Sequence, residues 1–118
     1  MERVPLEVSS HEPIVGVVVV RVRGQLDAHS AAQLLEHCHR ACPGGQHLVL
    51  NLSGVPFMAS SGVGALLALV EDFSQSSRSV RIAAASPSVD SVLRLLNLEE
   101  FLALDATEET SLKALEAA

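Results

Sequence analysis

The spacing of apolar residues divides the chain into segments with strand-like and helix-like periods. Residues 3–8 alternate between apolar and polar side chains, and residues 14–24 form a β-branched apolar run, so each segment predicts a strand. Residues 9–13 are rich in turn-forming side chains and predict the connection between them. Strands joined by so short a turn are expected to pair antiparallel.

From residue 28 onward the apolar period becomes helical, and strands and helices then alternate. The pattern predicts helices at 28–42, 60–77, 86–97 and 105–118, and strands at 46–54, 79–85 and 101–104. Asp27, Ser86 and Thr107 stand where three of these helices would be capped. Because strands joined through helices run parallel, this order predicts an α/β fold: a mixed, mostly parallel sheet of about four to five strands, flanked by about four helices.

Composition agrees with one globular domain over residues 1–118. The chain is 48% hydrophobic and 19% charged, and no stretch is typical of an interdomain linker. Its formal net charge is -6, it has eight Lys and Arg residues, and only 3% of its residues are aromatic. Nucleic acid is therefore not an expected partner, because proteins bind it through clustered cations and stacking aromatic rings.

The apolar runs and the cysteines indicate in which cellular compartment the protein is expected to act. The longest apolar run falls far short of the roughly 20 residues that span a membrane, and the first residues lack a signal peptide's apolar core, so we expect a cytoplasmic protein with no membrane partner. Cys38 and Cys42 share one stripe of a predicted helix and are interpreted as small core side chains. His37 and His39 lie about 100° to either side of Cys38, so no metal site is expected there.

The stretch FMASSGVG, residues 57–64, joins a predicted strand to a predicted helix. Ser60 or Ser61 can cap that helix, whose free N–H groups and positive dipole end attract an anion. A phosphate on Ser60 would meet those N–H groups and add about -1.5 to -2 charge. Gly62 and Gly64 each cost roughly 1 kcal/mol relative to Ala in a helix, which indicates that another backbone, of this domain or of a partner, approaches closely.

A second loop, GQLDAHS at residues 24–30, follows a neighbouring strand in the same way. In open α/β sheets functional loops gather at the carboxyl ends of parallel strands, so Asp27 is expected at the same edge as Ser60, with His29 nearby. Neither loop has the spacing of a phosphate-binding loop or of a nucleophile elbow, and no nucleophile, base and oxyanion donors converge. We therefore expect no enzyme activity and no cofactor. A capped turn with glycines that serve internal packing is the alternative from pattern alone.

Three stretches together resemble the STAS domain, and within it the free-standing bacterial anti-sigma-factor antagonists. They are VRVRGQLDAHSAAQL, HLVLNLSGVPFMASSGVGALLAL and VRIAAASPSVDSVLRLLNLEEFL, which cover nearly the whole chain in the order that the family has. The most specific part is the family motif (I/M)-D-S-(S/T)-G-(L/V)-G, which residues 58–64 match with Ala59 in place of the Asp. The family's G-E-L-D is matched by GQLD before the first helix.

The resemblance implies a partner and a switch. The partner is an anti-sigma factor with an ATP-dependent protein-kinase fold, which phosphorylates the serine at the position of Ser60. The unphosphorylated antagonist binds the anti-sigma factor and frees the sigma factor for transcription, and phosphorylation breaks that complex. A monomer or weak dimer is expected. The residues expected at the partner surface are Asp27, His29, Ala59, Ser60, Ser61, Gly62, Val63 and Gly64.

Ala59 leaves two further expectations open, because it removes the carboxylate that the family has beside its phosphoacceptor. One is an antagonist that binds constitutively and is poorly phosphorylated. The other is a STAS scaffold or accessory subunit, in a stress-sensing assembly or a lipid-transport ATPase complex, that uses the same face without a phosphorylation cycle.

Overall fold

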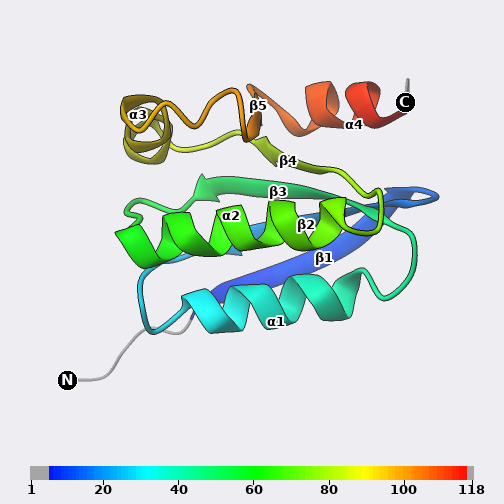
Figure 1. The fold of residues 1–118 in the computed structure, drawn as a ribbon, viewed down its shortest axis with the longest axis horizontal. Coiled ribbons are helices and arrows are strands. Elements are labelled where there is room, and N and C mark those ends of the chain that lie inside the picture. The colour runs from blue at the N-terminus through cyan, green and yellow to red at the C-terminus, as the bar shows by residue number, and fades with distance from the viewer. Residues whose placement is uncertain (1–5, 117–118) are drawn as a thin grey trace.

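The computed structural model describes residues 6–116, and strands and helices alternate along the chain after an initial hairpin (Figure 1). The elements are β1 (Glu7–Ile14), β2 (Val17–Arg23), α1 (Ala31–Ala41), β3 (His47–Gly54), α2 (Ser60–Ser74), β4 (Val80–Ala83), α3 (Pro87–Leu95), β5 (Ala103–Asp105) and α4 (Glu108–Glu116). The five strands form a sheet in the order β1-β2-β3-β4-β5. β1 is antiparallel to β2, and the other neighbours are parallel. The predicted mixed α/β fold is confirmed.

The sheet separates a large core from a small one because side chains alternate between its faces. Alternate residues of β2 and β3 pack beneath α1, α2 and α3; they are Val18, Val20, Val22, Leu48, Leu50 and Leu52. On the other face Val17, Val19 and Val49 pack with Leu115 of α4. The β-branched run of β2 is thus buried from both sides, as its central position in the sheet requires.

The first hairpin differs from the one that the sequence predicts. β1 continues through residues 9–13, where the sequence predicts a turn, and the connection lies at Val15 and Gly16. Gly16 has φ +87°, which glycine adopts without strain, and its N–H donates to Glu12 Oε2 at 2.9 Å. β1 is an edge strand with mostly exposed side chains, so its polar residues resemble a loop in the sequence. Residues 3–5 of the predicted strand lie outside the described part of the chain.

Two predicted helix caps are confirmed. Ser86 Oγ accepts from the N–H of Val89 at 3.4 Å, and Thr107 Oγ1 accepts from the N–H of Thr110 at 3.1 Å. Ser86 Oγ also donates to the carbonyl of Val55 at 2.6 Å, which ties the start of α3 to the end of β3. Within residues 6–116, no helix combines the length and apolarity needed to cross a membrane.

Candidate functional site

Two loops meet at the carboxyl ends of β2 and β3. The N–H of Leu26 donates to the carbonyl of Phe57 at 3.1 Å, and the N–H of Ala59 donates to the carbonyl of Leu26 at 2.9 Å. Leu26 and Met58 form a parallel bridge between these bonds. The start of α2 is therefore held beside the loop that carries Asp27, as the sequence predicts for parallel neighbours.

Ala59, rather than a serine, is the N-cap residue of α2. Its backbone is extended, with φ -82° and ψ 171°, and its carbonyl accepts from the N–H groups of Gly62 at 2.9 Å and Val63 at 3.2 Å. The bridge to the other loop keeps the chain extended through Ala59, so the helix begins only at Ser60. The prediction that Ser60 or Ser61 caps the helix is wrong for this reason, and α2 starts without a side-chain cap.

The residues predicted for the partner surface are not equally accessible. Ser60, Gly64 and His29 are exposed, whereas Asp27, Ala59 and Ser61 are half-buried. Gly62 and Val63 are buried and support the surface from inside the domain.

The two glycines of α2 have different surroundings. A Cβ on Gly62 would lie 2.8 Å from the carbonyl oxygen of Leu26 and 2.8 Å from Cγ of Met58. The close backbone that the sequence predicts is therefore supplied, at Gly62, by the neighbouring loop of this domain. A Cβ on Gly64 would have nothing within 4 Å. Gly64 consequently leaves a bare stretch of helix backbone facing solvent, one turn from Ser60.

Asp27 organises its own loop. Its Oδ1 accepts from the N–H of His29 at 2.9 Å and from the N–H of Ser30 at 3.3 Å. The hydrogen bond from the His29 backbone is the main reason why the pKa of the Asp27 carboxyl lies below its usual value. Helix α1 begins at Ala31 and not at residue 28, with Ser30 as its N-cap residue. Asp27 thus closes the turn before the helix instead of capping the helix itself.

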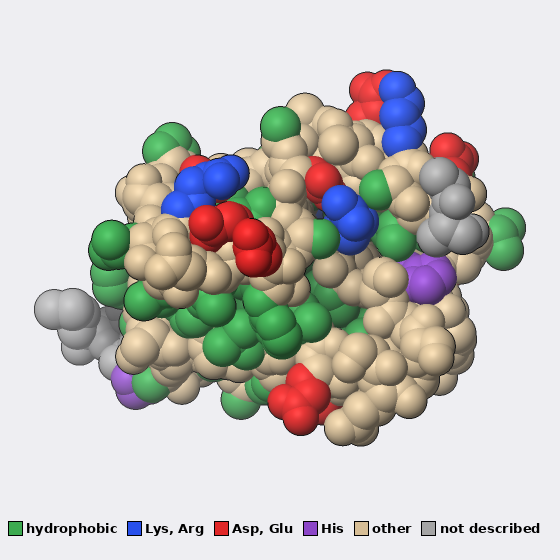
Figure 2. Space-filling view, turned by 45° about the horizontal axis from the view of Figure 1, so that its top comes forward, with side chains coloured by type: hydrophobic (Ala, Val, Ile, Leu, Met, Phe, Trp, Pro, Cys, Tyr) green, Lys and Arg blue, Asp and Glu red, His purple; other side chains and the backbone are tan. Residues whose placement is uncertain are grey.

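Phe57 is a feature of this edge that the sequence pattern does not single out. Its side chain is 53% exposed, and it lies three residues before Ser60. Aromatic side chains, Phe among them, are enriched in protein–protein interfaces. Apolar side chains also gather in a patch on one face of the molecule (Figure 2). Leu67 and Val70 of α2 and Val92 of α3 are only partly covered by their neighbours.

The two cysteines at the end of α1 are core side chains, and His39 of α1 lies beside Phe73 of α2. Both cysteines are buried and free, and burial raises the pKa of Cys38 to about 12 and that of Cys42 to about 11. His39 Nε2 lies 3.3 Å from a carboxylate oxygen of Asp72 on α2. In the part of the chain that the structure describes, no three His, Cys, Asp or Glu residues are grouped so that they could hold a metal ion.

Comparisons with known proteins agree with this geometry. The family model described as the STAS domain matches residues 8–111. An anti-sigma F factor antagonist of Paenibacillus polymyxa is 29% identical over 103 residues, which cover 86% of this chain and 88% of that protein.

Solved structures show the same fold. The anti-sigma factor antagonist SpoIIAA in its unphosphorylated form superposes with a TM-score of 0.78 at 25% identity, covering 95% of this chain and 98% of that one. The Bacillus cell fate determinant SpoIIAA in its phosphorylated form gives 0.71 at 25% identity, covering 92% and 99%. Since the family model spans both loops of the candidate site and nearly every element of the fold, this chain belongs to the STAS domain family.

Proposed function

We propose that this chain is an anti-sigma-factor antagonist that acts in the cytoplasm and regulates sigma-factor-dependent transcription. Its partner is an anti-sigma factor with a protein-kinase fold, which docks on the start of α2 and the loop of Asp27. The observation that carries the proposal is the exposed Ser60 at the first position of α2, held beside the loop of Asp27 by hydrogen bonds between the two loops. The relative from Paenibacillus polymyxa, matched over most of its length, supports it by its name.

The shape of the edge fits binding better than catalysis. Ser60 and Gly64 expose small side chains or none, so a partner's backbone can come close to α2, and Phe57 adds an apolar contact beside them. Ser60 has no hydrogen bond to an acid or base among the described residues, so it fits the role of a kinase substrate rather than that of a nucleophile.

Phosphorylation of Ser60 is the proposed switch. A phosphate at this position would lie at the positive end of α2, where its oxygens accept hydrogen bonds from the free N–H groups of the domain. It would also add about -1.5 to -2 charge close to Asp27, in a surface that must be desolvated when the partner docks. The modified protein therefore stays folded while the complex is weakened. The SpoIIAA structures, in phosphorylated and unphosphorylated forms, support this cycle by analogy.

Capture of the partner tests the docking proposal. Wild type and Ser60→Asp are immobilised, exposed to lysate of the source organism, and the retained proteins are identified by mass spectrometry. We expect a kinase-fold anti-sigma factor on wild type and its loss from Ser60→Asp. Retention of a transporter ATPase or a large STAS assembly by both would contradict the proposal and favour the scaffold function, for which the loss of a carboxylate at Ala59 is the motivating observation.

A kinase assay tests the switch separately. The purified protein is incubated with its anti-sigma factor and ATP, and intact mass reports phosphate incorporation. We expect one phosphate on wild type and on Ser61→Ala, and none on Ser60→Ala. Ala59→Asp restores the family carboxylate and should be modified faster than wild type. Unmodified wild type together with modified Ala59→Asp would mean that this chain binds constitutively.

A further inference from the structure

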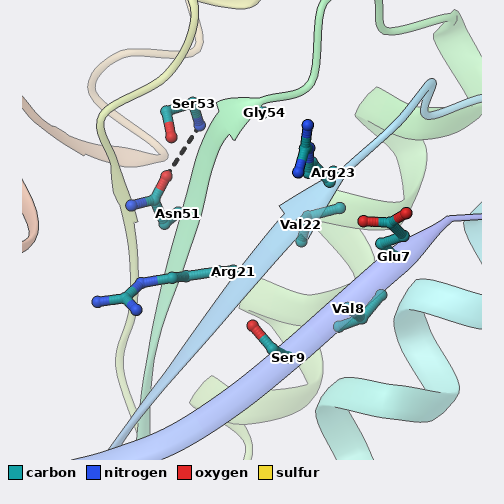
Figure 3. Close-up of a pocket in the computed structure, with 9 residues that line it drawn as sticks. All are labelled: Glu7, Val8, Ser9, Arg21, Val22, Arg23, Asn51, Ser53 and Gly54. Atoms are coloured by element: carbon teal, nitrogen blue, oxygen red, sulfur yellow. Dashed lines mark hydrogen bonds between the residues drawn. The ribbon is translucent and has the colours of Figure 1, made fainter.

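A hollow of about 480 Å³ lies on the sheet face that α4 leaves partly open (Figure 3). It lies over β1, β2 and β3, and its lining consists of Glu7, Val8, Ser9, Arg21, Val22, Arg23, Asn51, Ser53 and Gly54. Along β2 this face changes from apolar to basic: Val17 and Val19 belong to the core under α4, whereas Arg21 and Arg23 are exposed. The basic end is the carboxyl end of the strand, where the candidate site begins.

Arg23 differs from the other cations of residues 6–116 because it has no partner there. The others are engaged as Arg21–Glu108, Arg40–Glu36, Arg81–Asp105, Arg94–Asp90 and Lys113–Glu109, while Arg78 lies over the ring of Phe73. Glu7 is the cross-strand neighbour of Arg23, but no ion pair joins the two. In Figure 3 the Arg23 side chain extends toward the end of the sheet where Gly54 lies, and the Glu7 carboxylate stays over β1.

Gly54 leaves space for the Arg23 side chain to extend in this direction. A Cβ on Gly54 would lie 2.8 Å from Cγ of Arg23 and 2.7 Å from the carbonyl oxygen of Val22. Gly54 ends β3, and the N–H of Gly24 donates to its carbonyl at 3.0 Å. From these two glycines the chain continues directly into the loops of Asp27 and Ser60. Arg23 therefore projects from the base of the candidate site.

We infer that Arg23 extends the docking surface and binds a carboxylate side chain of the protein that docks at Ser60. This inference rests on the proposed function. The whole chain carries a formal net charge of -6, so an acidic patch on the partner would be repelled over most of the surface. Arg23, unpaired among the described residues and placed at the edge of the site, attracts such a patch and fixes its register, and it raises the association rate more than the affinity.

Association kinetics with the captured anti-sigma factor test the inference, using wild type, Arg23→Glu and Glu7→Gln. Arg40→Glu is the matched control, because Arg40 is an exposed arginine near the end of α1. We expect Arg23→Glu to associate about tenfold more slowly at low salt, with the difference shrinking at high salt, and Arg40→Glu to change the rate less than twofold. Glu7→Gln removes the carboxylate of the cross-strand neighbour of Arg23 and should speed association.

The outcomes separate the two proposals. If wild type binds and Arg23→Glu associates as fast as Arg40→Glu, the contact at Arg23 is wrong while the docking proposal stands. If Arg23→Glu is slower at every salt concentration, the effect is not electrostatic and the inference also fails. If wild type binds no anti-sigma factor, the proposed function itself fails. Urea unfolding of each variant checks that these surface substitutions leave the fold intact.

Discussion

Ala59 leaves the start of α2 without a side-chain cap, and this gives a test at the scale of one residue. Its extended backbone is already that of an N-cap, so a carboxylate at this position can accept the free N–H groups of the first turn. We expect Ala59→Asp to raise the free energy of unfolding by about 1 kcal/mol, measured by urea denaturation at neutral pH. Ala59→Asn caps without charge and should recover most of this gain. A loss of stability in both variants would contradict the assigned cap.

Gly62 and Gly64 provide a matched pair of substitutions. Gly62→Ala places a methyl group 2.8 Å from a backbone carbonyl oxygen, so we expect a loss of about 1–3 kcal/mol of stability. Gly64→Ala meets open space and should gain about 1 kcal/mol, because alanine is the better helix former. Urea denaturation of both variants measures the difference. Changes of the same sign in the two variants would contradict the packing described for the start of α2.

The Gly64→Ala variant also tests binding, because its expected effect on binding is opposite to its expected effect on stability. If the bare backbone at Gly64 faces the partner, the more stable variant should bind the anti-sigma factor more weakly than wild type does. Unchanged binding would place the partner away from this turn of α2.

The sequence predicts that the two loops of the candidate site lie at one edge of the sheet, but not the contacts within it. Parallel strands and their following loops were enough to bring Asp27 and Ser60 together, because strand direction determines which ends meet. The cap at Ala59 was missed because it depends on the bridge between Leu26 and Met58, a contact between distant segments. The sequence does not single out Arg23 for a similar reason, because only the folded structure shows that the other cations of residues 6–116 have partners and Arg23 has none there.

At the scale of elements, hydrogen bonds from charged groups attach α4 to the sheet, in addition to the small apolar core that α4 covers. Arg21 donates twice to the Glu108 carboxylate, at 2.8 and 2.8 Å, and the amide of Asn51 also donates to it. Further along, the carboxylate of Asp105 accepts from Arg81 and from the hydroxyl of Ser111 on α4. These hydrogen bonds hold the start of α4 on the sheet face that it only partly covers. At this point of the face, apolar side chains give way to polar ones.

Glu108 makes this attachment sensitive to acid. The hydrogen bond from Arg21 is the main cause that lowers the pKa of Glu108 from 4.5 to about 2. Because the folded-state pKa lies below the unfolded value, the carboxylate stabilises the protein above pH 4.5, and this contribution is lost as pH falls toward 2. We expect Glu108→Gln to cost about 1 kcal/mol at neutral pH and progressively less under acid.

Urea denaturation of wild type and variant across this pH range measures the effect. Glu109→Gln is the control, since Glu109 is 77% exposed and forms only a surface pair with Lys113. An equal loss for Glu108→Gln at every pH would contradict the lowered pKa.

The order of elements was predictable and the first hairpin was not. Strands such as β2 and β3 are buried on both faces, so their continuous apolar runs are visible in the sequence. β1 is an exposed edge strand whose residues 9–13 resemble a loop, and its pairing with β2 decides its conformation. Gly16 was the available signal for the turn, because a positive φ is most easily adopted by glycine.

At the scale of the whole molecule, the fold places a helix start, two loops and Arg23, which has no partner within residues 6–116, at one edge of the sheet. The helix packing beneath and α4 on the other face hold this edge in place, so it can be recognised with little rearrangement. A phosphate at Ser60 would change the charge of this edge without disturbing the core. We therefore expect a change of affinity without a change of fold.

Calorimetric titration of the anti-sigma factor with wild type and with Ser60→Asp tests whether the partner docks at the start of α2. We expect wild type to bind with one site and Ser60→Asp to bind at least about tenfold more weakly, while its urea midpoint stays close to that of wild type. Equal affinities would contradict the claim that the start of α2 is the surface on which the partner docks.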